Sequence, residues 1–427
     1  MLTQAPRGTR DILPEEAGKW VFLENKFREI CRRFSYKEIR TPVFEHTELF
    51  QRGVGETTDI VEKEMYTFLD KSGRSITLKP EGTAPTARAY IEHKLYTQTL
   101  PVKLFYIIPG FRYERPQAGR LREFHQFGIE AFGSESPHID VEVMLLAVSF
   151  LKNLGLDDIK LHINSIGCET CRSDYVKALK DFLGESRQNL CDTCRSRLDR
   201  NPLRVLDCKN PDCQRTLKEA PAVLDFLCEK CKTHFETIKN DLSLLKIDYK
   251  VDPRIVRGLD YYTRTVFEII SDDLGAQSTV CGGGRYDNLV QECGGPTTPA
   301  AGFGMGIERL ITILEKKNLL KIPEEKVDVY IAPLTEEYGN TALRLLYRFR
   351  ENGISAETDY LKRSLKAQMK YADKIMAQFV VLIGEEEESS GFYTVKDLAT
   401  GQQQKVAGDK IFEYISNNIR KGCGEVE

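Results

Sequence analysis

The sequence predicts an α+β fold: an antiparallel sheet with flanking helices, interrupted by a helical cysteine-rich insertion and followed by a C-terminal α/β domain. Strand and helix patterns are mixed through residues 1–167 and 251–322, and the strands follow one another as hairpin neighbours would. Residues 168–250 are instead helical, charged and rich in cysteine. From 327 to 427, strands and helices alternate in a piece long enough to form a compact domain.

Length and composition are typical of a soluble enzyme with more than one domain. The chain has 427 residues, of which 29% are charged and 41% hydrophobic. Its net charge is −3, so any contact with nucleic acid must use a local basic face. The N-terminus lacks the apolar core of a signal peptide, and no apolar run reaches the length of about 18 residues that a membrane span needs. We therefore expect a cytoplasmic protein.

Individual elements follow from periodicity. Residues 14–34 carry apolar side chains at helical spacing after a proline and two acidic residues, which is typical of a helix start. Residues 36–50 alternate as a strand does and end in a glycine-rich turn. The next elements expected are a strand, turn and helix at 74–93, apolar strands at 102–114 and 121–133 joined by a polar loop at 114–120, and a helix at 137–155. The last domain should contain a strand at 327–334, a helix at 342–353, a strand at 377–387, a hairpin at 392–406 and a helix at 409–421.

The stretch IVRGLDYYTRTVFEII, residues 255–270, places arginine, aspartate and tyrosine in a pattern that otherwise predicts a strand. Buried charge is costly unless it is paired, so this strand is either hydrated or lines a site for a charged ligand.

Arg112, Arg257 and Arg309 stand at strands or strand ends in three separate stretches. The arginine fork matches phosphate oxygens, so three forks together indicate a triphosphate. A single buried arginine is often a structural ion pair, but three, each beside glycine or an acidic residue, are less well explained that way. The sequence has no P-loop motif. Residues 302–306 have the spacing G-x-G-x-G, which is not the dinucleotide-binding motif.

Eight of the twelve cysteines fall between residues 168 and 231. In a reducing cytosol this clustering favours metal binding over disulfides. C-x-x-C pairs are half-sites for tetrahedral zinc coordination, so eight thiolates would hold one or two structural Zn²⁺ ions, and His234 could replace one thiolate. The alternative is a set of free thiols left from an ancestral site. The candidate ligands are Cys168, Cys171, Cys191, Cys194, Cys208, Cys213, Cys228 and Cys231.

Several blocks resemble the signature motifs of class II aminoacyl-tRNA synthetases: YKEIRTPVFE, FRYERPQAGRLREFHQFGIEAFG and AAGFGMGIERLI. The stretches IVRGLDYYTRTVFEI and GGRYD resemble the histidine-specific blocks of the histidyl-tRNA synthetase family, and RGTRDILP and KPEGTAPTARAYIEH are similar to that family too. The resemblance runs from residue 7 to the last helix. It implies a class II catalytic domain at 1–167 and 251–322, interrupted by the insertion at 168–250, and an anticodon-binding domain at 327–427.

The resemblance also implies the reaction. L-Histidine would be activated by ATP with Mg²⁺ to histidyl-adenylate and transferred to the 3′ end of histidine tRNA, releasing AMP and diphosphate. Arg257 and Arg112 match the catalytic positions at the α-phosphate, and Arg309 matches the γ-phosphate clamp. Glu114 and Phe124 match the positions beside and stacked on adenine. The positions that match the histidine site are Glu81, Thr83, Gln126, Glu130 and Tyr262.

Tyr261 and Tyr262 are adjacent in the expected strand, and adjacent strand residues face opposite ways. At most one of them could then face the ligand. We assign Tyr262 to the ligand and Tyr261 to core packing.

Two partner surfaces are expected. Residues 36–45 resemble the motif that forms the class II dimer interface and look like a proline-limited interface strand, which predicts a homodimer. Residues 344–374 hold eight cations against four acidic residues. A solvated helix face is the default explanation of such a run. This basic segment, however, belongs to a compact domain that accompanies a catalytic domain, and the catalytic domain must hold a long RNA. We therefore expect the segment to bind the anticodon of histidine tRNA.

Two rival functions remain at this level. A non-catalytic regulatory paralogue of ATP phosphoribosyltransferase has a similar fold, but the intact context of Arg257 and the separate C-terminal domain oppose it. A zinc-dependent nucleic-acid-binding protein would explain the cysteines and leave the three arginine stretches unexplained. Histidine-dependent ATP–pyrophosphate exchange distinguishes the three.

Overall fold

The computed structural model of the chain describes residues 3–55, 58–116, 120–206, 208, 210–273, 279–322 and 326–419. The polar loop expected at 114–120 and the end of the last expected helix lie partly outside these residues. The chain divides into two compact units, residues 1–321 and 322–427. No helix in the described ranges is long and apolar enough to cross a membrane.

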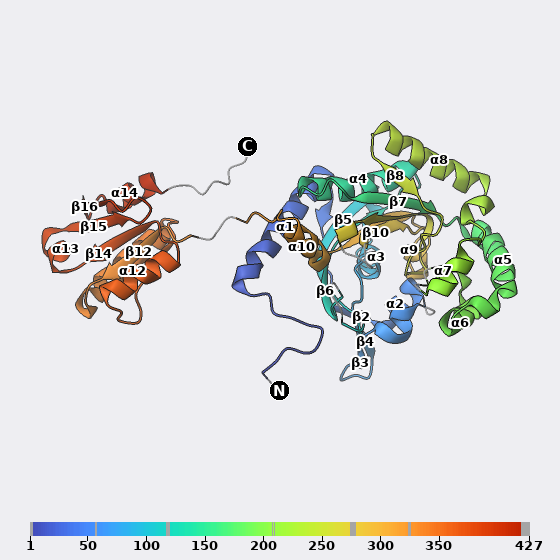
Figure 1. Ribbon diagram of the computed structural model, residues 1–427, viewed down its shortest axis with the longest axis horizontal. Coiled ribbons are helices and arrows are strands. Elements are labelled where there is room, and N and C mark those ends of the chain that lie inside the picture. Colours follow the sequence, from blue (N-terminus) through green and yellow to red (C-terminus); the bar gives the residue numbers. More distant parts are fainter. Residues whose placement is uncertain are drawn as a thin grey trace. The chain divides into compact units, whose positions relative to one another are not determined.

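An eight-stranded sheet forms the centre of the first unit (Figure 1). Its order is β1-β5-β6-β11-β10-β9-β7-β8, and all neighbours from β5 to β7 are antiparallel. Only the edge strands β1 and β8 pair in parallel, which confirms the antiparallel sheet expected from the sequence. The strands are β1 (Lys37–Glu38), β5 (Val102–Phe111), β6 (Glu123–Phe132), β7 (Lys160–Ser165), β8 (Tyr249–Val251), β9 (Thr263–Ile270), β10 (Thr279–Arg285) and β11 (Ala300–Gly306).

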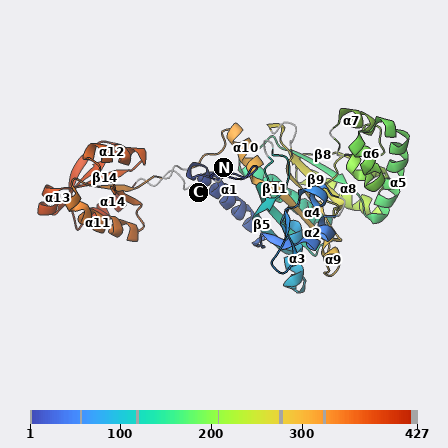
Figure 2. The ribbon, with the colours of Figure 1, turned by 90° about the horizontal axis from the view of Figure 1, so that it is seen from below.

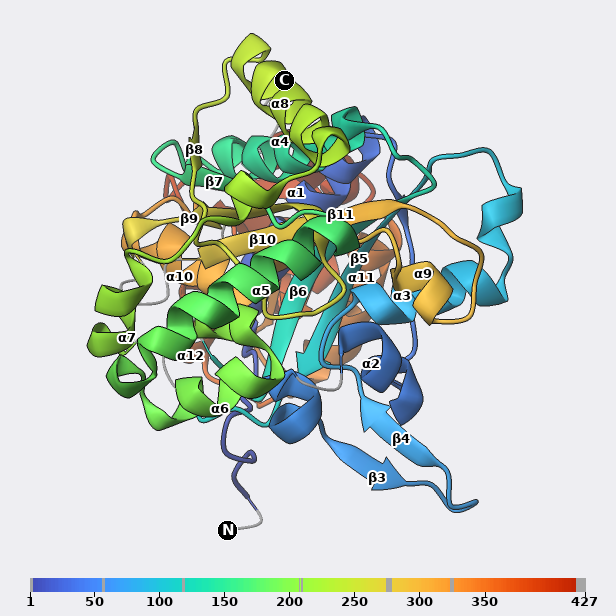
Figure 3. The ribbon, with the colours of Figure 1, turned by 90° about the vertical axis from the view of Figure 1, so that its right-hand side faces the viewer.

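The main hydrophobic core lies between one face of this sheet and four helices. They are α1 (Pro14–Arg33), α4 (Pro137–Asn153), α8 (Glu229–Leu244) and α10 (Ile307–Lys316). The rings of Phe27 on α1 and Phe127 on β6 stack with centroids 4.4 Å apart, and Phe150 of α4 packs edge-on against both. Figure 3 shows α4 and α8 together on this side of the sheet.

The opposite face of the sheet is only partly covered. Helix α3 (Thr83–Glu92) packs there with α2 (Thr47–Val54) and α9 (Leu289–Glu292), beside a small sheet of β2 (Phe44–His46), β4 (Ser75–Leu78) and β3 (Thr67–Leu69). A second apolar cluster under α3 includes Tyr90 and Phe132, whose rings stack at 4.5 Å. The remainder of this face is open and bears the cavity described below.

The cysteine-rich helices α5 (Glu169–Glu185), α6 (Asp192–Arg200) and α7 (Pro211–Leu217) gather beside α8 (Figure 2). They have a core of their own, which includes Tyr175, Leu198 and Val223. Helix α8 packs on α4, and β8 pairs with β7, so the last part of the expected insertion contributes to the main core and sheet.

The second unit is a five-stranded mixed sheet of order β13-β12-β14-β15-β16 with helices packed on it. Its parallel part comes from strand–helix–strand connections, and the expected hairpin pairs β15 with β16. This confirms a separate α/β domain. Its elements are β12 (Val329–Pro333), α11 (Gly339–Glu351), β13 (Ala356–Thr358), α12 (Leu365–Lys374), β14 (Phe379–Ile383), α13 (Glu385–Ser390), β15 (Phe392–Asp397), β16 (Gln403–Ala407) and α14 (Ile411–Asn418).

Candidate active site and metal centres

A cavity on the open face of the large sheet collects nine of the ten side chains selected from the sequence. The tenth, Glu130, is fully buried directly below it. The nine lining residues are Glu81, Thr83, Arg112, Glu114, Phe124, Gln126, Arg257, Tyr262 and Arg309.

Strand alternation produces the floor of this cavity. Phe124, Gln126 and Glu130 occupy every second or fourth position of β6 and therefore face the same side. Strand β11 lies beside β6 and carries glycine at the matching positions, with Gly302 opposite Glu130 and Gly306 opposite Gln126. A Cβ on Gly302 would lie 2.0 Å from Glu130 Oε2. The G-x-G-x-G stretch is thus a strand that leaves room for its neighbour's side chains, and not a dinucleotide-binding turn.

Arg257 is held in a charged, hydrogen-bonded setting at the cavity wall. Its Nη1 pairs with Glu268 Oε1 on β9, and Thr279 Oγ1 donates to the other carboxylate oxygen at 3.0 Å. Burial acts to lower the pKa of Arg257, but the Glu268 carboxylate and the neighbouring Tyr262 and Tyr261 together raise that pKa, so the guanidinium stays charged. Gly282 makes this position possible, because a Cβ there would lie 2.3 Å from Arg257 Nη2.

The other two arginines each donate to a backbone carbonyl group, and Arg112 Nη1 also lies 3.9 Å from Glu114 Oε1. Arg112 Nε donates to Pro80 O at 2.9 Å, and its guanidinium carbon lies 5.2 Å from the centroid of the Phe124 ring. Arg309 Nη1 donates to Thr279 O at 2.8 Å. Burial lowers the pKa of Arg309, and the neighbouring Arg120 lowers it further. An anionic ligand in the cavity would relieve this repulsion.

Two carboxyl groups lie at the other end of the cavity. Glu81 accepts hydrogen bonds from the backbone N–H groups of Thr83 (2.7 Å) and Ala84 (2.8 Å), which fixes it at the start of α3. Glu130 accepts from Thr83 Oγ1 at 2.7 Å. Burial raises the pKa of Glu130 to about 8, although the hydroxyl groups that donate to it, those of Tyr286, Thr83 and Tyr106, act to lower that pKa. The sheet therefore holds a carboxyl group that keeps its proton at neutral pH.

The structure adds two residues that the sequence analysis missed. Tyr106 donates to Glu130 Oε1 at 2.9 Å, and Tyr286 donates to Glu130 Oε2. Tyr286 lies within the GGRYD block, whose resemblance to the family singles out no individual residue. Tyr106 lies in an apolar strand pattern where nothing distinguishes it from a core tyrosine. Gly128 and Gly82 make room for it, because a Cβ on them would lie 2.2 Å and 2.4 Å from the Tyr106 ring.

Tyr261 packs in an apolar cluster as expected, but the expectation that only one of the two tyrosines faces the cavity is wrong. Strand β9 begins only at Thr263, and residues 255–262 form turns, so the alternation rule does not apply to them. Tyr261 and Tyr262 both line the cavity, with ring centroids 4.7 Å apart.

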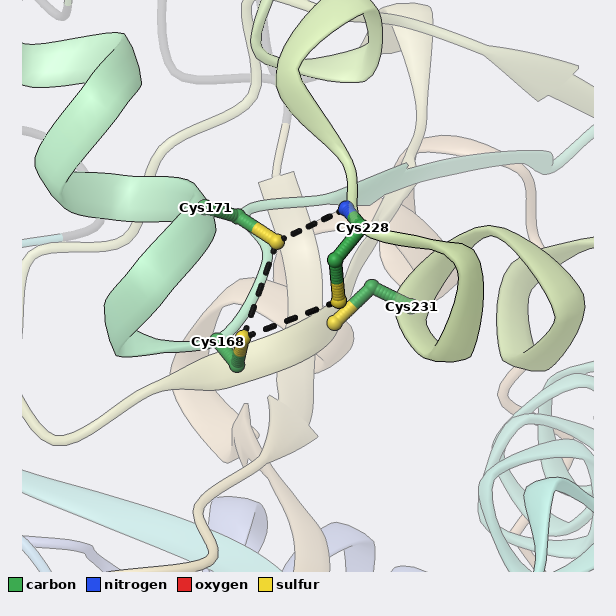
Figure 4. A group of neighbouring side chains, drawn as sticks. All are labelled: Cys168, Cys171, Cys228 and Cys231. Atoms are coloured by element: carbon green, nitrogen blue, oxygen red, sulfur yellow. Dashed lines mark hydrogen bonds between the residues drawn. The ribbon is translucent and has the colours of Figure 1, made fainter.

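The eight cysteines form two separate clusters of four, which settles the pairing left open by their spacing. Cys168, Cys171, Cys228 and Cys231 make one, with sulfur atoms pointing toward one another (Figure 4). Cys191, Cys194, Cys208 and Cys213 make the other. In each cluster all four Sγ atoms lie within 4.8 Å of one another.

The geometry of both clusters fits tetrahedral zinc. Four thiolates at about 2.3 Å from Zn²⁺ are about 3.8 Å apart, and the Sγ–Sγ distances include 3.6 Å for Cys168–Cys171 and 3.9 Å for Cys191–Cys208. Backbone N–H groups also donate to sulfur, as from Cys228 to Cys171 at 3.1 Å. Burial acts to raise the pKa of Cys168, but backbone donors and neighbouring thiols lower it to about 6, which favours the thiolate that a metal needs.

His234 is not part of either cluster, so its expected role as a substitute ligand is wrong. Its Nε2 lies 3.4 Å from Asp140 Oδ2, in a buried group that also contains Arg285. Helix α8 turns His234 toward α4 and away from the Cys231 thiolate, which lies three residues earlier.

Comparison with known proteins agrees with this arrangement along the whole chain. A family described as "Histidyl-tRNA synthetase" matches residues 8–310, and one described as "Anticodon binding domain" matches residues 328–418. The chain belongs to the histidyl-tRNA synthetase family. The "Histidine--tRNA ligase" of Caldanaerobacter subterraneus subsp. tengcongensis is 58% identical over 418 residues, which are 98% of this chain and 100% of that protein.

Solved structures agree as well. The apo histidyl-tRNA synthetase of S. aureus superposes with a TM-score of 0.82 at 41% identity, covering 96% of this chain and 99% of that one. An ATP phosphoribosyltransferase regulatory subunit/histidyl-tRNA synthetase from Bacillus halodurans C has a TM-score of 0.63 at 23% identity, covering 87% of this chain and 97% of that one. The latter likeness shows a shared fold only.

Proposed function

We infer that the chain joins L-histidine to histidine tRNA in two steps. Histidine and ATP form histidyl-adenylate with release of diphosphate, and the histidyl group then passes to the 3′ end of the tRNA with release of AMP. The observation that carries this is the full-length 58% identity to a histidine–tRNA ligase, in a chain whose cavity collects arginines and carboxyl groups. The regulatory paralogue is not favoured, because its likeness extends to the fold alone.

The arginines account for the first step. The histidine carboxylate attacks the α-phosphorus of ATP, the bond from that phosphorus to the bridging oxygen breaks, and diphosphate leaves. We propose that Arg257 and Arg112 stabilise the charge that develops on the α-phosphate, and that Arg309 holds the γ-phosphate. Phe124 and Glu114 would hold the adenine, the first by stacking.

Mg²⁺ would enter with ATP and neutralise part of the phosphate charge. This ion usually takes one or two carboxylates besides phosphate oxygens. Glu308 lines the cavity and offers such oxygens, so the residues present fit the ion.

The carboxyl end of the cavity suits histidine. Glu81, Thr83 and Gln126 would hold the α-amino group, and Glu130 and Tyr262 the imidazole. A buried carboxyl that needs a partner rejects an apolar side chain of similar size, because the carboxyl would then remain unpaired. Tyr106 and Tyr286 would orient Glu130 from below.

We propose one structural Zn²⁺ in each cysteine cluster, hence two per chain. The support is the enclosed four-sulfur geometry at both places. The catalytic cavity lies outside both clusters, so these ions would contribute folding energy and no chemistry at the phosphates.

We propose a homodimer that uses residues 36–45. The support is an apolar surface around the small sheet, where the side chains of Val43 and Phe44 are 42% and 54% exposed and Leu69 of β3 is 70% exposed. An exposed apolar patch with an edge strand is typical of an isologous contact.

We propose that the second unit reads the anticodon of histidine tRNA. On α12, Lys366, Lys370 and Lys374 are exposed at every fourth position and form a line of positive charge. Tyr360 lies before this helix with 62% of its surface exposed, as a base-stacking residue would. The domain limits expected from the sequence and a cytoplasmic location complete the proposal.

Charging of histidine tRNA tests the proposed function directly. The purified chain with ATP, Mg²⁺ and labelled histidine should attach label to histidine tRNA and not to a tRNA for another amino acid. Failure to charge, together with stimulation of an ATP phosphoribosyltransferase, would favour the regulatory paralogue.

A further inference from the structure

The segment 255–262 carries much of the cavity wall and has little backbone support of its own. Arg257, Leu259, Tyr261 and Tyr262 all line the cavity. Among the described residues, the backbone from 256 to 262 makes one main-chain hydrogen bond, from Asp260 N to Val54 O at 3.1 Å. A segment with so few main-chain partners must take its conformation from side chains that reach its carbonyl groups.

Two arginines of the cysteine-rich insertion reach those carbonyl groups. Arg204 Nη2 donates to Gly258 O at 2.6 Å and to Asp260 Oδ1 at 3.2 Å. Arg172 Nη2 donates to Tyr262 O. Hydrogen bonds from a charged donor are the stronger kind. Arg204 contacts the middle of the segment and Arg172 contacts its last residue.

Each arginine is placed by one cysteine cluster. Arg172 directly follows Cys171 in the first turn of α5. Arg204 lies in a short 3₁₀ turn, Pro202–Val205, between α6 and Cys208, and Cys208 N donates to Val205 O at 3.0 Å. The position of each guanidinium group therefore depends on the fold of its cluster.

The second cluster is also tied by ion pairs to residues 59–62. Arg197 of α6 pairs with Asp59 at 2.7 Å, and Arg200 pairs with Glu62 at 3.2 Å. The segment that contains Asp59 follows Val54, which holds Asp260. Helix α6 and the turn after it thus hold both segments that meet at Asp260.

We propose that the cysteine-rich insertion sets the conformation of the histidine-binding segment 255–262, with Arg204 and Arg172 as positioning residues. This rests on the proposed function of the cavity. It assigns the insertion a part in amino-acid activation, before any tRNA binds. Displacing the segment by about 1 Å moves Arg257 and Tyr262 together and can lower the rate on the order of 10²-fold.

Arg204→Ala is the main test. Hydrogen exchange of peptides covering 255–263 should become faster through the Asp260 amide, which makes the segment's main-chain bond to Val54 O. The kcat/KM for histidine in ATP–pyrophosphate exchange should fall by roughly 10²-fold. Zinc content should stay as in the parent chain. Arg204→Lys should recover part of the loss, because its ammonium group still donates. Arg195→Ala is the matched control: Arg195 is on α6, is exposed and pairs with Asp192 at 3.3 Å, so its effect should stay within about twofold.

A second variant connects the arginine to its cluster. Cys191→Ser should produce the same faster exchange at 255–263, and Cys191→Ser with Arg204→Ala should be no worse than either alone, because both act through one contact. Unchanged hydrogen exchange at 255–263 in Arg204→Ala would overturn the inference, as would an equal loss of activity in Arg195→Ala or loss of zinc from Arg204→Ala. Hydrogen exchange needs no substrate. A parent chain without histidine-dependent activity would therefore refute the proposed function and leave this test intact.

Discussion

Arg257→Ala is the perturbation that most directly separates a catalytic arginine from a structural one. Arg257 pairs with Glu268, and Gly282 leaves space for its guanidinium. The donor is thus already in place before charge develops on the α-phosphate. Removing one such preorganised donor lowers a rate by about 10²–10³-fold, or about 2.7–4 kcal/mol. Glu268 keeps the hydrogen bond from Thr279 Oγ1, so the stability loss should stay within about 1–3 kcal/mol and the chain should remain folded.

The assay is single-turnover formation of histidyl-adenylate by rapid quench, with histidine affinity measured separately at equilibrium. The rate constant should fall by about 10²–10³-fold, while histidine affinity changes much less. Gly282→Ala should reproduce part of the loss without removing any charge, because its Cβ would lie 2.3 Å from Arg257 Nη2. Gly184→Ala, where a Cβ meets nothing within 4 Å, is the matched control. A rate constant for Arg257→Ala close to that of the parent chain would mean that this arginine serves only the fold.

Four further predictions follow from particular features. Burial raises the pKa of Glu130 from 4.5 to about 8, so the stability tied to its proton is complete below pH 4.5 and is lost as pH rises through 8. The fall in Tm across this pH window should be shallower in Glu130→Gln, and an unchanged slope would count against the assignment. Metal analysis after gel filtration should find two zinc ions per chain. The variant Cys191→Ser should lose one of these ions and still bind ATP. Metal-free protein purified from zinc-supplemented cells would favour the alternative of free thiols. Deleting residues 327–427 should leave histidine-dependent ATP–pyrophosphate exchange measurable and abolish most tRNA charging, whereas equal loss of both would make this unit a support for the fold. Sedimentation at micromolar concentration should show a dimer, and Phe44→Asp should weaken it. Leu244→Asp is the control, because Leu244 of α8 is 80% exposed and the substitution should leave the dimer unchanged. An active monomeric parent chain would refute the interface.

Periodicity was sufficient for the elements that alternate or repeat regularly. The strands β5 and β6 and the helices α1 and α4 lie where the apolar pattern predicts them. The three arginines were also found from the sequence, because a guanidinium at a strand end has few structural explanations. Their meeting in one cavity depends on the order of the sheet, which brings β6, β11, β10 and β9 side by side from distant parts of the chain.

Other features depend on contacts that spacing does not contain. Residues 255–262 satisfied a strand pattern, yet their carbonyl groups are held by arginines from the insertion instead of by a neighbouring strand. Tyr106 has the sequence context of a core residue, and its place beside Glu130 depends on two glycines, Gly82 and Gly128, that leave room for its ring. The C-x-x-C pairs predicted metal sites, but Cys168 and Cys228 meet across 60 residues, so their pairing required the fold.

The central claim is that the cavity activates histidine with ATP, and ATP–pyrophosphate exchange tests it most directly. The purified chain is incubated with ATP, Mg²⁺ and labelled pyrophosphate, and each of the standard amino acids is added in turn without tRNA. Label should enter ATP with histidine alone, and Glu130→Gln should weaken that dependence without creating another. Exchange that does not depend on histidine, or no exchange with any amino acid in a folded dimer, would contradict the account.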